Sequence, residues 1–311
     1  MTLAILFPGQ GSQAIGMMDG FSAHPIVRET FEEASTVLGD DLWKLVAEGP
    51  SEALNLTTNT QPVMLTAGVA VYRAWIASGG AKPMVVAGHS LGEYTALVAA
   101  GALAFADAVP LVRFRAQAMQ DAVPAGVGAM AAIMGGDDDA VAAACAEAAQ
   151  GQVVEPVNFN GPGQVVIAGH REAVERAIAL ARQKGAKRGV MLPVSAPFHS
   201  SLLRPAAEKL AARLAQVTFV PPTIPVIHNV DVAEHAMPDA IRTALAQQAA
   251  SPVRWTATVR RMADNGITHV VECGPGRVLA GMNRRIVENV ESYALIDSDA
   301  INETLAALKG T

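Results

Sequence analysis

Residues 88–92 have the sequence Gly-His-Ser-Leu-Gly, in which Ser90 lies between two glycines. The apolar residues 84–87 before it predict a short buried strand, and residues 93–100 after it predict a helix that ends at Gly101. A strand, a sharp turn and a helix around such a serine form a nucleophile elbow, which exposes the hydroxyl in a cleft. The glycines fit this interpretation, because the turn needs unusual backbone angles and a close approach of helix to strand. The alternative to a nucleophile is a purely structural glycine turn.

A serine hydroxyl needs a neighbouring base to become a nucleophile at neutral pH, and histidine is the usual one. Two histidines are candidates. His199 lies in a loop that we expect at the mouth of the cleft, whereas His269 directly precedes a predicted strand. With Asp231 or Asp264, His269 would complete a triad in the chain order Ser, Asp, His that α/β-hydrolases use. By position in the predicted fold, His199 is the better candidate.

Other polar groups could serve the same site. Residues 7–13, Phe-Pro-Gly-Gln-Gly-Ser-Gln, follow the first predicted strand and could present backbone N–H groups as part of an oxyanion hole. Arg113 and Arg115 lie on a mainly apolar helix over 109–119, where an inward-facing arginine needs a partner. Two solvated surface arginines fit the pattern equally well. His89 is expected to orient the turn by a hydrogen bond and not to act as the base.

The first third of the chain alternates strand and helix signals, which predicts a mostly parallel sheet with helices on both faces. The expected elements are a strand at 3–7, helices at 26–38 and 62–75, a strand at 84–87 and two helices up to residue 119. A similar pattern follows residue 195, with helices at 202–214, 239–249, 253–265 and 278–286 and strands at 224–228 and 269–273. The helix at 278–286 is expected to close the fold.

Residues 126–195 have a different order of elements. Strands are expected at 129–134, 153–159, 164–168 and 188–193, and helices at 137–149 and 171–184. This β-α-β-β-α-β order is ferredoxin-like, and the turn Asn-Gly-Pro-Gly at 160–163 favours a hairpin. We therefore expect an α/β-hydrolase-like large domain made of residues 1–125 and 196–311, with residues 126–195 inserted as a ferredoxin-like subdomain. The cleft should lie between them.

Composition excludes several classes of protein. A chain of 311 residues that is 51% hydrophobic and 17% charged can bury a large core. Its net charge of -6 and the absence of basic runs argue against a nucleic-acid surface. Uncharged stretches such as 94–106 are shorter than the roughly 20 residues of a membrane helix. Residues 3–7 predict a first strand and not a signal peptide. We expect a cytoplasmic protein that does not bind membranes.

The cysteines and histidines carry no metal-site or disulfide pattern. Cys145 and Cys273 are expected to be buried free thiols, since only two cysteines occur and their spacing is not that of a disulfide scaffold. The spacing of the seven histidines predicts no metal site.

Six segments, taken together and in order, closely resemble the malonyl-CoA:acyl carrier protein transacylase family, and the resemblance covers nearly the whole chain. They are residues 7–13, 88–93, 115–120 (Arg-Ala-Gln-Ala-Met-Gln), 156–160 (Pro-Val-Asn-Phe-Asn), 198–199 (Phe-His) and 272–276 (Glu-Cys-Gly-Pro-Gly).

This resemblance implies a ping-pong transfer. Ser90 would attack the thioester of malonyl-CoA with His199 as base, and the malonyl group would then pass to the phosphopantetheine thiol of holo acyl carrier protein. Backbone N–H groups of Gln10 and Leu91 would hold the oxyanion, and the main-chain carbonyl of Gln248 would orient the histidine. No cofactor or metal is implied, with malonyl-CoA serving as donor substrate, and we expect a monomer that supplies fatty acid synthesis.

The resemblance also implies substrate selection. Arg115 would hold the malonyl carboxylate through a bidentate pair, for which a planar guanidinium is well suited. Phe198 resembles a bulky residue of malonyl-selective acyltransferase domains, and Leu91 resembles their aliphatic residue in place of a glutamine. Two positions depart from the usual pattern of the family: Gly161, where relatives often have serine, and Pro197. These departures affect only the fine substrate preference. Malonyl is therefore expected over methylmalonyl.

Three alternatives remain open from the residues. The chain could be a serine esterase or thioesterase, a malonyltransferase of a polyketide or other malonate-using pathway, or a non-catalytic scaffold that binds carrier protein. Carrier proteins are typically acidic, so a docking face should be basic. The candidate residues for such a face are Arg277, Arg284, Arg285, Lys184, Lys187 and Arg188.

Overall fold

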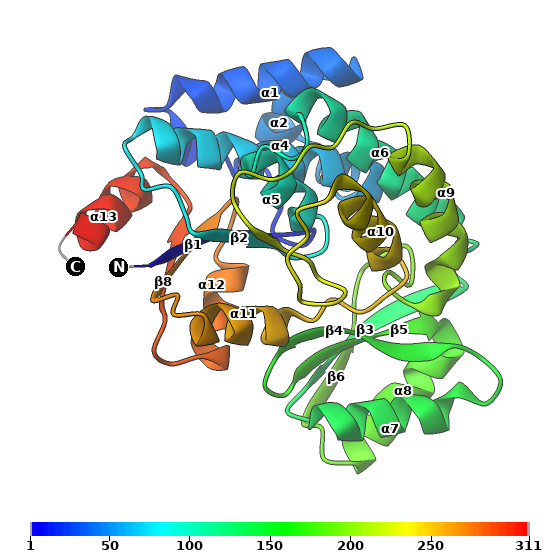
Figure 1. The fold of residues 1–311 in the computed structure, drawn as a ribbon. Coiled ribbons are helices and arrows are strands. Elements are labelled where there is room, and N and C mark those ends of the chain that lie inside the picture. The colour runs from blue at the N-terminus through cyan, green and yellow to red at the C-terminus, as the bar shows by residue number, and fades with distance from the viewer. Residues whose placement is uncertain (1, 310–311) are drawn as a thin grey trace.

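The computed structural model describes residues 2–309 and contains a five-stranded central sheet in the order β7-β2-β1-β8-β9 (Figure 1). All four strand pairings in this sheet are parallel. Its strands are β1 (Leu3–Phe7), β2 (Val85–Gly88), β7 (Val226–Ile227), β8 (His269–Cys273) and β9 (Glu291–Leu295). The carboxyl ends of β1 and β2 therefore open at the same edge of the sheet, and chain segments that follow them meet there.

Helices cover both faces of this sheet, as expected from the alternating pattern. Along β1, Leu3, Ile5 and Phe7 pack into one apolar cluster and Ala4 and Leu6 into another, because successive side chains point to opposite faces. The first cluster includes residues of α4 (Thr57–Ala77) and α5 (Gly92–Ala99), and the second includes residues of α11 (Trp255–Asp264) and α12 (Val278–Ile286). β1 is thus buried on both sides and forms the centre of the fold.

Further helices surround this core. They are α1 (Pro25–Leu38), α2 (Leu42–Glu48), α3 (Ser51–Leu54), α6 (Phe105–Asp121), α9 (Arg204–Leu214), α10 (Pro238–Gln248) and α13 (Ser298–Lys309), with short 3-10 turns at Asp19–Phe21 and Ser201–Leu203. The sequence-based expectation that the helix at 278–286 closes the fold is wrong, because β9 and α13 follow it. β9 is an edge strand with a mixed sequence, Glu-Ser-Tyr-Ala-Leu, and so lacks the apolar run by which the inner strands were recognised.

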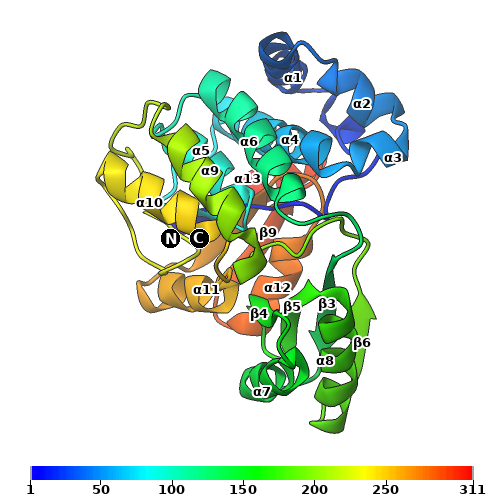
Figure 2. The same ribbon diagram turned by 90° about the vertical axis from the view of Figure 1, so that its right-hand side faces the viewer.

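A second sheet is separate and antiparallel, in the order β4-β5-β3-β6. Its strands are β3 (Gly128–Met134), β4 (Val154–Gly161), β5 (Gln164–His170) and β6 (Arg188–Met191), and its helices are α7 (Asp138–Ala149) and α8 (Arg171–Gln183). The two helices pack side by side against one face of this sheet (Figure 2). The predicted β-α-β-β-α-β order is confirmed, whereas the limits 126–195 of a subdomain stay a prediction.

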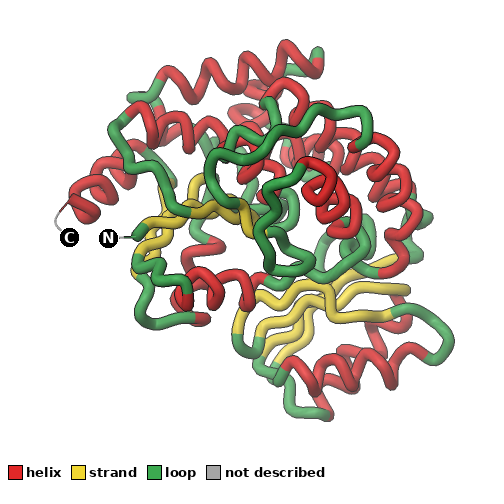
Figure 3. Tube along the Cα trace, in the orientation of Figure 1, coloured by secondary structure: helices red, strands yellow, loops and turns green. Residues whose placement is uncertain are grey.

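The other face of the antiparallel sheet meets the rest of the molecule, and the two sheets are seen as separate sets of strands in Figure 3. Met130 and Val166 of this face belong to the large apolar cluster. The loop between α10 and α11 continues the contact, because Val253 N donates to Val157 O (2.8 Å) and Phe159 N donates to Val253 O (3.0 Å). β4 is thereby fixed beside the carboxyl edge of the parallel sheet.

Two further observations concern the described residues. Within residues 2–309, no helix has both the length and the apolar character needed to span a bilayer. Cys145 and Cys273 are buried free thiols, as expected. Burial raises the pKa of Cys145 to about 12 and raises that of Cys273 well above its usual range, so neither is a reactive thiolate near neutral pH.

Candidate active site

Ser90 lies on a tight turn between β2 and α5. Its backbone angle φ is 52°, a value that residues other than glycine rarely adopt. The two glycines beside it are required by close packing. A Cβ at Gly88 would lie 1.9 Å from the backbone of Gly92, and one at Gly92 would lie 2.1 Å from the carbonyl oxygen of Phe7. The turn therefore has the geometry of a nucleophile elbow and holds the serine at the carboxyl edge of the parallel sheet.

His199 and Ser90 are in direct contact, with 2.7 Å between Nε2 and Oγ. On the other side of the ring, Nδ1 lies 2.8 Å from the main-chain oxygen of Gln248, the last residue of α10. Because a carbonyl oxygen can only accept, Nδ1 carries the hydrogen and Nε2 presents its lone pair to the serine. Ser90 Oγ–H consequently donates to His199, which is the arrangement that proton abstraction requires.

The charge state of His199 follows from its surroundings. The imidazole is 3% exposed, and burial, reinforced by the nearby charge of Arg115, lowers its pKa to about 3. The hydrogen bond to Gln248 acts in the opposite direction and is the weaker effect. His199 is thus neutral near pH 7 and can accept a proton.

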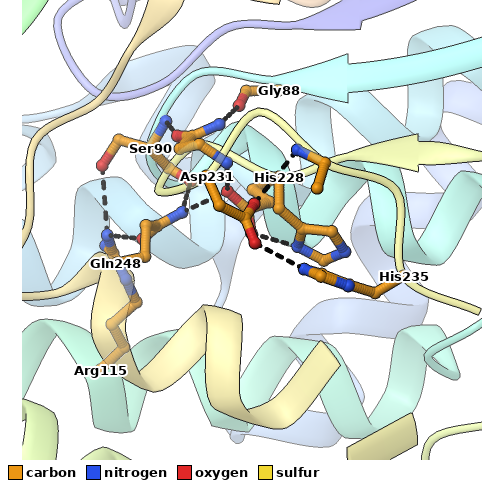
Figure 4. Close-up of polar contacts among 10 residues, drawn as sticks. Gly88, Ser90, Arg115, His228, Asp231, His235 and Gln248 are labelled. Carbon is orange, nitrogen blue, oxygen red and sulfur yellow. Dashed lines mark hydrogen bonds and ion pairs between the residues drawn. The ribbon is translucent and has the colours of Figure 1, made fainter. Parts of the chain in front are cut away.

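Arg115 of α6 is 1% exposed, and its guanidinium lies beside Ser90. Its Nη1 donates to Gln61 Oε1 (2.8 Å), and its Nη2 donates to Gln248 Oε1 (2.9 Å) and Ser90 Oγ (3.1 Å). Figure 4 shows Gln248 beside the contact of Arg115 with Ser90 and hydrogen-bonded to both residues. No carboxylate among the described residues forms an ion pair with this guanidinium. A buried cation whose hydrogen-bond partners are all neutral is suited to bind an anionic ligand.

The other arginine of the same helix behaves differently. Arg113 forms an ion pair with Asp40 at 2.9 Å, and both side chains are partly exposed. The sequence pattern left open whether these two arginines face inward or outward, and the structure separates them into one buried and one surface residue.

A cavity of about 120 Å³ joins these groups. It is lined by Gln10, Gln61, His89, Ser90, Leu91, Arg115, Met119, Met130, Asn158, Val166, Leu192, Val194, Phe198 and His199. Its size and largely apolar walls suit a small acyl group with one charged end. A larger groove of about 1210 Å³ reaches His199 from another side, but neither Ser90 nor Arg115 lines it, so the smaller cavity is the candidate site.

Comparison with known proteins agrees with this geometry. Residues 5–306 match the family described as acyl transferase domain. A malonyl CoA-acyl carrier protein transacylase of Escherichia coli K12 is 57% identical over 303 residues, which cover 97% of this chain and 98% of that protein. The chain belongs to the malonyl CoA-acyl carrier protein transacylase family. It is therefore an acyltransferase.

Solved structures of relatives have the same fold as this acyltransferase. An acyl-carrier-protein S-malonyltransferase from Burkholderia pseudomallei superimposes with a TM-score of 0.97 at 60% identity, covering 98% of this chain and 100% of that one. A malonyl-transacylase in complex with a type II PKS acyl-carrier protein (PlMCAT:AntF) gives a TM-score of 0.97 at 50% identity, covering 99% and 100% of the two chains.

Gln10 and Leu91 of the acyltransferase are the residues whose backbone N–H groups we expect to form the oxyanion hole. Both line the cavity beside Ser90. Within the described residues, neither backbone N–H donates a hydrogen bond to a protein group. Gly274, which has a φ of 148°, packs closely against the loop that carries Gln10, since a Cβ there would lie 2.7 Å from Pro8. These two N–H groups are thus available to a ligand.

The alternative triad is wrong. His269 lies at the first residue of β8, the end of the strand opposite to the site, where it contacts Thr268 Oγ1 (2.8 Å) and stacks on Tyr293. Asp231 pairs with His235 at 2.7 Å (Figure 4), and Asp264 lines the larger groove.

His89 is also directed away from the serine hydroxyl. Its Nε2 lies 2.8 Å from Asn160 Oδ1, and its ring packs near that of Trp255. Burial lowers its pKa, so it is a neutral link between the elbow and β4.

Sequence reasoning missed three buried residues beneath the elbow of the acyltransferase: Glu93, His228 and Asn229. Glu93 is fully buried and accepts hydrogen bonds from the side chains of His228 and Gln248 and from the backbone of Asn229. A usable signal was present, because His228 ends the predicted strand at 224–228 and Asn229 directly follows it, and the carboxyl end of that strand reaches the site.

Proposed function

We propose that this acyltransferase moves the malonyl group of malonyl-CoA to the phosphopantetheine thiol of acyl carrier protein, through a malonyl ester of Ser90. The observation that carries this proposal is the contact of buried Arg115 with Ser90 Oγ at 3.1 Å. A short acyl group that ends in a carboxylate places its charge beside the guanidinium while its carbonyl carbon faces the hydroxyl. The printed names of the relatives support the same donor and acceptor.

In the first half-reaction, Ser90 Oγ attacks the thioester carbonyl carbon while its proton moves to His199 Nε2. The negative charge of the tetrahedral intermediate falls on the former carbonyl oxygen, which the N–H groups of Gln10 and Leu91 would stabilise. The carbon–sulfur bond then breaks, and the leaving sulfur takes the proton from His199. The products are malonyl-Ser90 and coenzyme A.

The second half-reaction reverses these roles. The phosphopantetheine thiol gives its proton to His199 Nε2, and the resulting thiolate attacks the ester carbonyl. The Ser90 oxygen leaves and recovers the proton. The backbone oxygen of Gln248 supports both steps, since it accepts from Nδ1 and stabilises the imidazolium that forms each time. We propose that no metal or cofactor takes part, because the serine and histidine suffice for every proton transfer.

Selection among acyl groups is proposed to follow from the walls of the cavity. Phe198 is 9% exposed and lines the cavity directly beside His199. In a space of about 120 Å³, the branch methyl of methylmalonyl would compete with this ring, whereas malonyl would not. Arg115 would select against acetyl, which has no carboxylate to replace the neutral partners of the guanidinium.

The fold assignment can be made finer in the same way. We propose that residues 1–125 and 196–311 form an α/β-hydrolase-like domain, because an elbow serine follows one parallel strand and its histidine comes from a later loop. Residues 126–195 would be the ferredoxin-like subdomain, in agreement with its antiparallel sheet order. A cytoplasmic location and a monomeric state stay predictions.

The basic residues proposed to dock carrier protein make different contacts. Arg285 Nη2 donates to Gln164 Oε1 (2.7 Å) beside the β4–β5 turn, and that turn follows Asn160, the partner of His89. By contrast, Arg284 donates to Ser292 O on β9, and Lys184 pairs with Glu147 at 2.9 Å between α7 and α8.

We therefore propose that Arg285, together with Arg277 and Arg188, receives the acidic carrier protein near the mouth of the cleft. Lys187 stays a candidate, and Lys184 and Arg284 are the least suited of the six.

Intact-mass analysis tests the proposal. The protein is mixed with malonyl-CoA and then with holo carrier protein. We expect an adduct of one malonyl group that persists in water and moves to the carrier protein. Rapid hydrolysis without an acceptor would instead favour a thioesterase, and the absence of an adduct would reject the proposal. Fatty acid synthesis is the proposed pathway, and transfer to a polyketide carrier protein in parallel tests the alternative.

A further inference from the structure

The carboxamide of Asn229 spans the turn that carries Ser90. Its Oδ1 accepts from the Ser90 N–H (2.7 Å), and its Nδ2 donates to the Gly88 carbonyl (2.7 Å). Asn229 is fully buried, so these bonds form out of contact with water. One side chain thus joins the residues on either side of His89 and closes the elbow from below.

The need for this bridge follows from the length of β7. This strand pairs with β2 only at Val86 and Ala87 and ends at Ile227, so it supplies no backbone partner for Gly88 O or Ser90 N. The side chain of Asn229 takes the place of the missing strand residue. Buried backbone groups without a partner are costly, and the turn is already strained by the positive φ of Ser90.

Glu93 in turn holds Asn229 in place. The backbone N–H of Asn229 donates to Glu93 Oε2 (2.9 Å), and His228 Nδ1 lies 2.7 Å from Oε1. Gln248 Nε2 also donates to Oε2 (2.9 Å). A fully buried carboxylate is stable only with such donors, and here they come from the end of β7 and from α10.

The same contacts reach the base and the cation. Besides binding Glu93, Gln248 donates from Nε2 to Ser90 O (2.9 Å) and accepts from Arg115 at Oε1 (2.9 Å). Its backbone oxygen accepts from His199. The position of the serine relative to the histidine therefore depends on groups that Glu93 gathers beneath the elbow.

We propose that Asn229 is a positioning residue that holds Ser90 Oγ in line with His199 Nε2, and that Glu93 anchors it. This inference rests on the proposed nucleophilic role of Ser90 but not on the identity of the acyl group. Misplacement of a reacting atom by about 1 Å costs on the order of 100-fold in rate. Loss of the Asn229 bridge should therefore act on kcat and leave the KM for malonyl-CoA nearly unchanged.

Two reactions of Asn229→Ala separate this inference from the proposed function. Labelling of Ser90 by phenylmethylsulfonyl fluoride reports the nucleophile alone, and single-turnover acylation by malonyl-CoA reports the complete first step. We expect both rates to fall by a similar factor, on the order of 100-fold. If malonyl-CoA fails to acylate the wild type while labelling still depends on Asn229, the proposed function fails and the inference stands.

Asn283→Ala is the matched control. Asn283 is 1% exposed, accepts from Trp255 Nε1 (3.2 Å) and lies on α12, outside the cavity. The Asn283→Ala variant loses a buried carboxamide of the same kind, but its Ser90 should be labelled at the wild-type rate. If Asn229→Ala does not fold, Asn229→Leu keeps a side chain of nearly the same size and shape and removes both hydrogen bonds of the bridge. Wild-type labelling in a folded Asn229 variant, or an equal loss in Asn283→Ala, would overturn the inference.

Discussion

Arg115 donates a hydrogen bond from Nη2 to the Oγ of Ser90 over 3.1 Å, so the buried cation of the site touches the proposed nucleophile. This contact has two consequences. First, a carboxylate bound to Arg115 lies close to the carbonyl carbon that Ser90 would attack, so only a short acyl chain can join the two groups. Second, the contact places positive charge beside Oγ at the moment when the proton moves to His199, which favours the developing negative charge.

Arg115→Ala should weaken the selection of malonyl-CoA over acetyl-CoA. A hydrogen bond to a charged group contributes about 1.5–3 kcal/mol, so the ratio of the two acylation rates should fall by roughly 10- to 150-fold. Competition between the two donors, read by intact mass, measures this ratio. Arg113→Ala is the matched control, because Arg113 lies on the same helix but pairs with Asp40 at the surface. Unchanged selectivity in Arg115→Ala would refute the assignment of the guanidinium.

The low pKa of His199 predicts an unusual pH profile. Acylation needs the neutral imidazole, and an ordinary histidine would lose activity as the pH falls through about 6.5. Burial and the charge of Arg115 lower the pKa to about 3, so the rate of Ser90 labelling should stay level through this range and decline only in much stronger acid. Arg115→Ala removes one of the causes of the low pKa of His199 and should move the decline to higher pH. A decline near the ordinary value in the wild type would contradict this account.

Phe198→Ser should admit methylmalonyl-CoA. Removal of the ring enlarges a cavity of about 120 Å³ beside the base, and one methyl group in an apolar pocket changes discrimination by about 10- to 200-fold. The ratio of kcat/KM values for malonyl-CoA and methylmalonyl-CoA measures the change. Met130→Leu, which alters another wall of the cavity at nearly constant volume, should leave the ratio close to that of the wild type. No gain in methylmalonyl turnover would count against a role for the ring.

Gln248→Ala separates the side chain of Gln248 from its backbone. The variant keeps the main-chain oxygen that accepts from His199 but loses the carboxamide that binds Arg115, Ser90 O and Glu93. Acylation by malonyl-CoA should fall by roughly 10-fold or more, as expected for one lost hydrogen bond to a charged group. Labelling by phenylmethylsulfonyl fluoride should fall less, because the base keeps its orientation. Equal losses in both reactions would mean that the carboxamide does not act through Arg115.

Arg285→Glu should slow transfer from malonyl-Ser90 to holo carrier protein and spare acylation by malonyl-CoA. Reversal of one charge near the mouth of the cleft acts on the encounter with an acidic partner, so the effect should shrink as salt is added. Lys184→Glu is the control, since this lysine pairs with Glu147 between α7 and α8. Stopped-flow or quenched measurements of each half-reaction provide the rates. A similar loss in both half-reactions would argue against docking at Arg285.

The elbow illustrates what can be predicted from sequence. Gly88, Ser90 and Gly92 are neighbours in the chain, and the strand before them and the helix after them follow from local periodicity. The order of strands and helices in the antiparallel sheet was predictable for the same reason. β9 was not predicted, because an edge strand with a mixed sequence has a weak local signal.

Choices between similar residues that depend on contacts with distant parts of the chain could not be made in this way. Arg113 and Arg115 fit the same helix pattern equally well, and only the packing of α6 against the site buries the second. His199 and His269 were both reasonable bases until the structure placed them at opposite ends of the parallel strands.

The sequence alone was enough to predict the elbow around Ser90, the order of most strands and helices and the resemblance to one family of acyltransferases. Which cation faces Ser90, and that Glu93 and Asn229 lie beneath it, became clear only from the tertiary structure. Backbone conformation depends mainly on neighbours along the chain and so leaves a local signal. Burial and side-chain hydrogen bonds, by contrast, depend on segments such as β2, β7 and α10 that meet only after the sheet is formed.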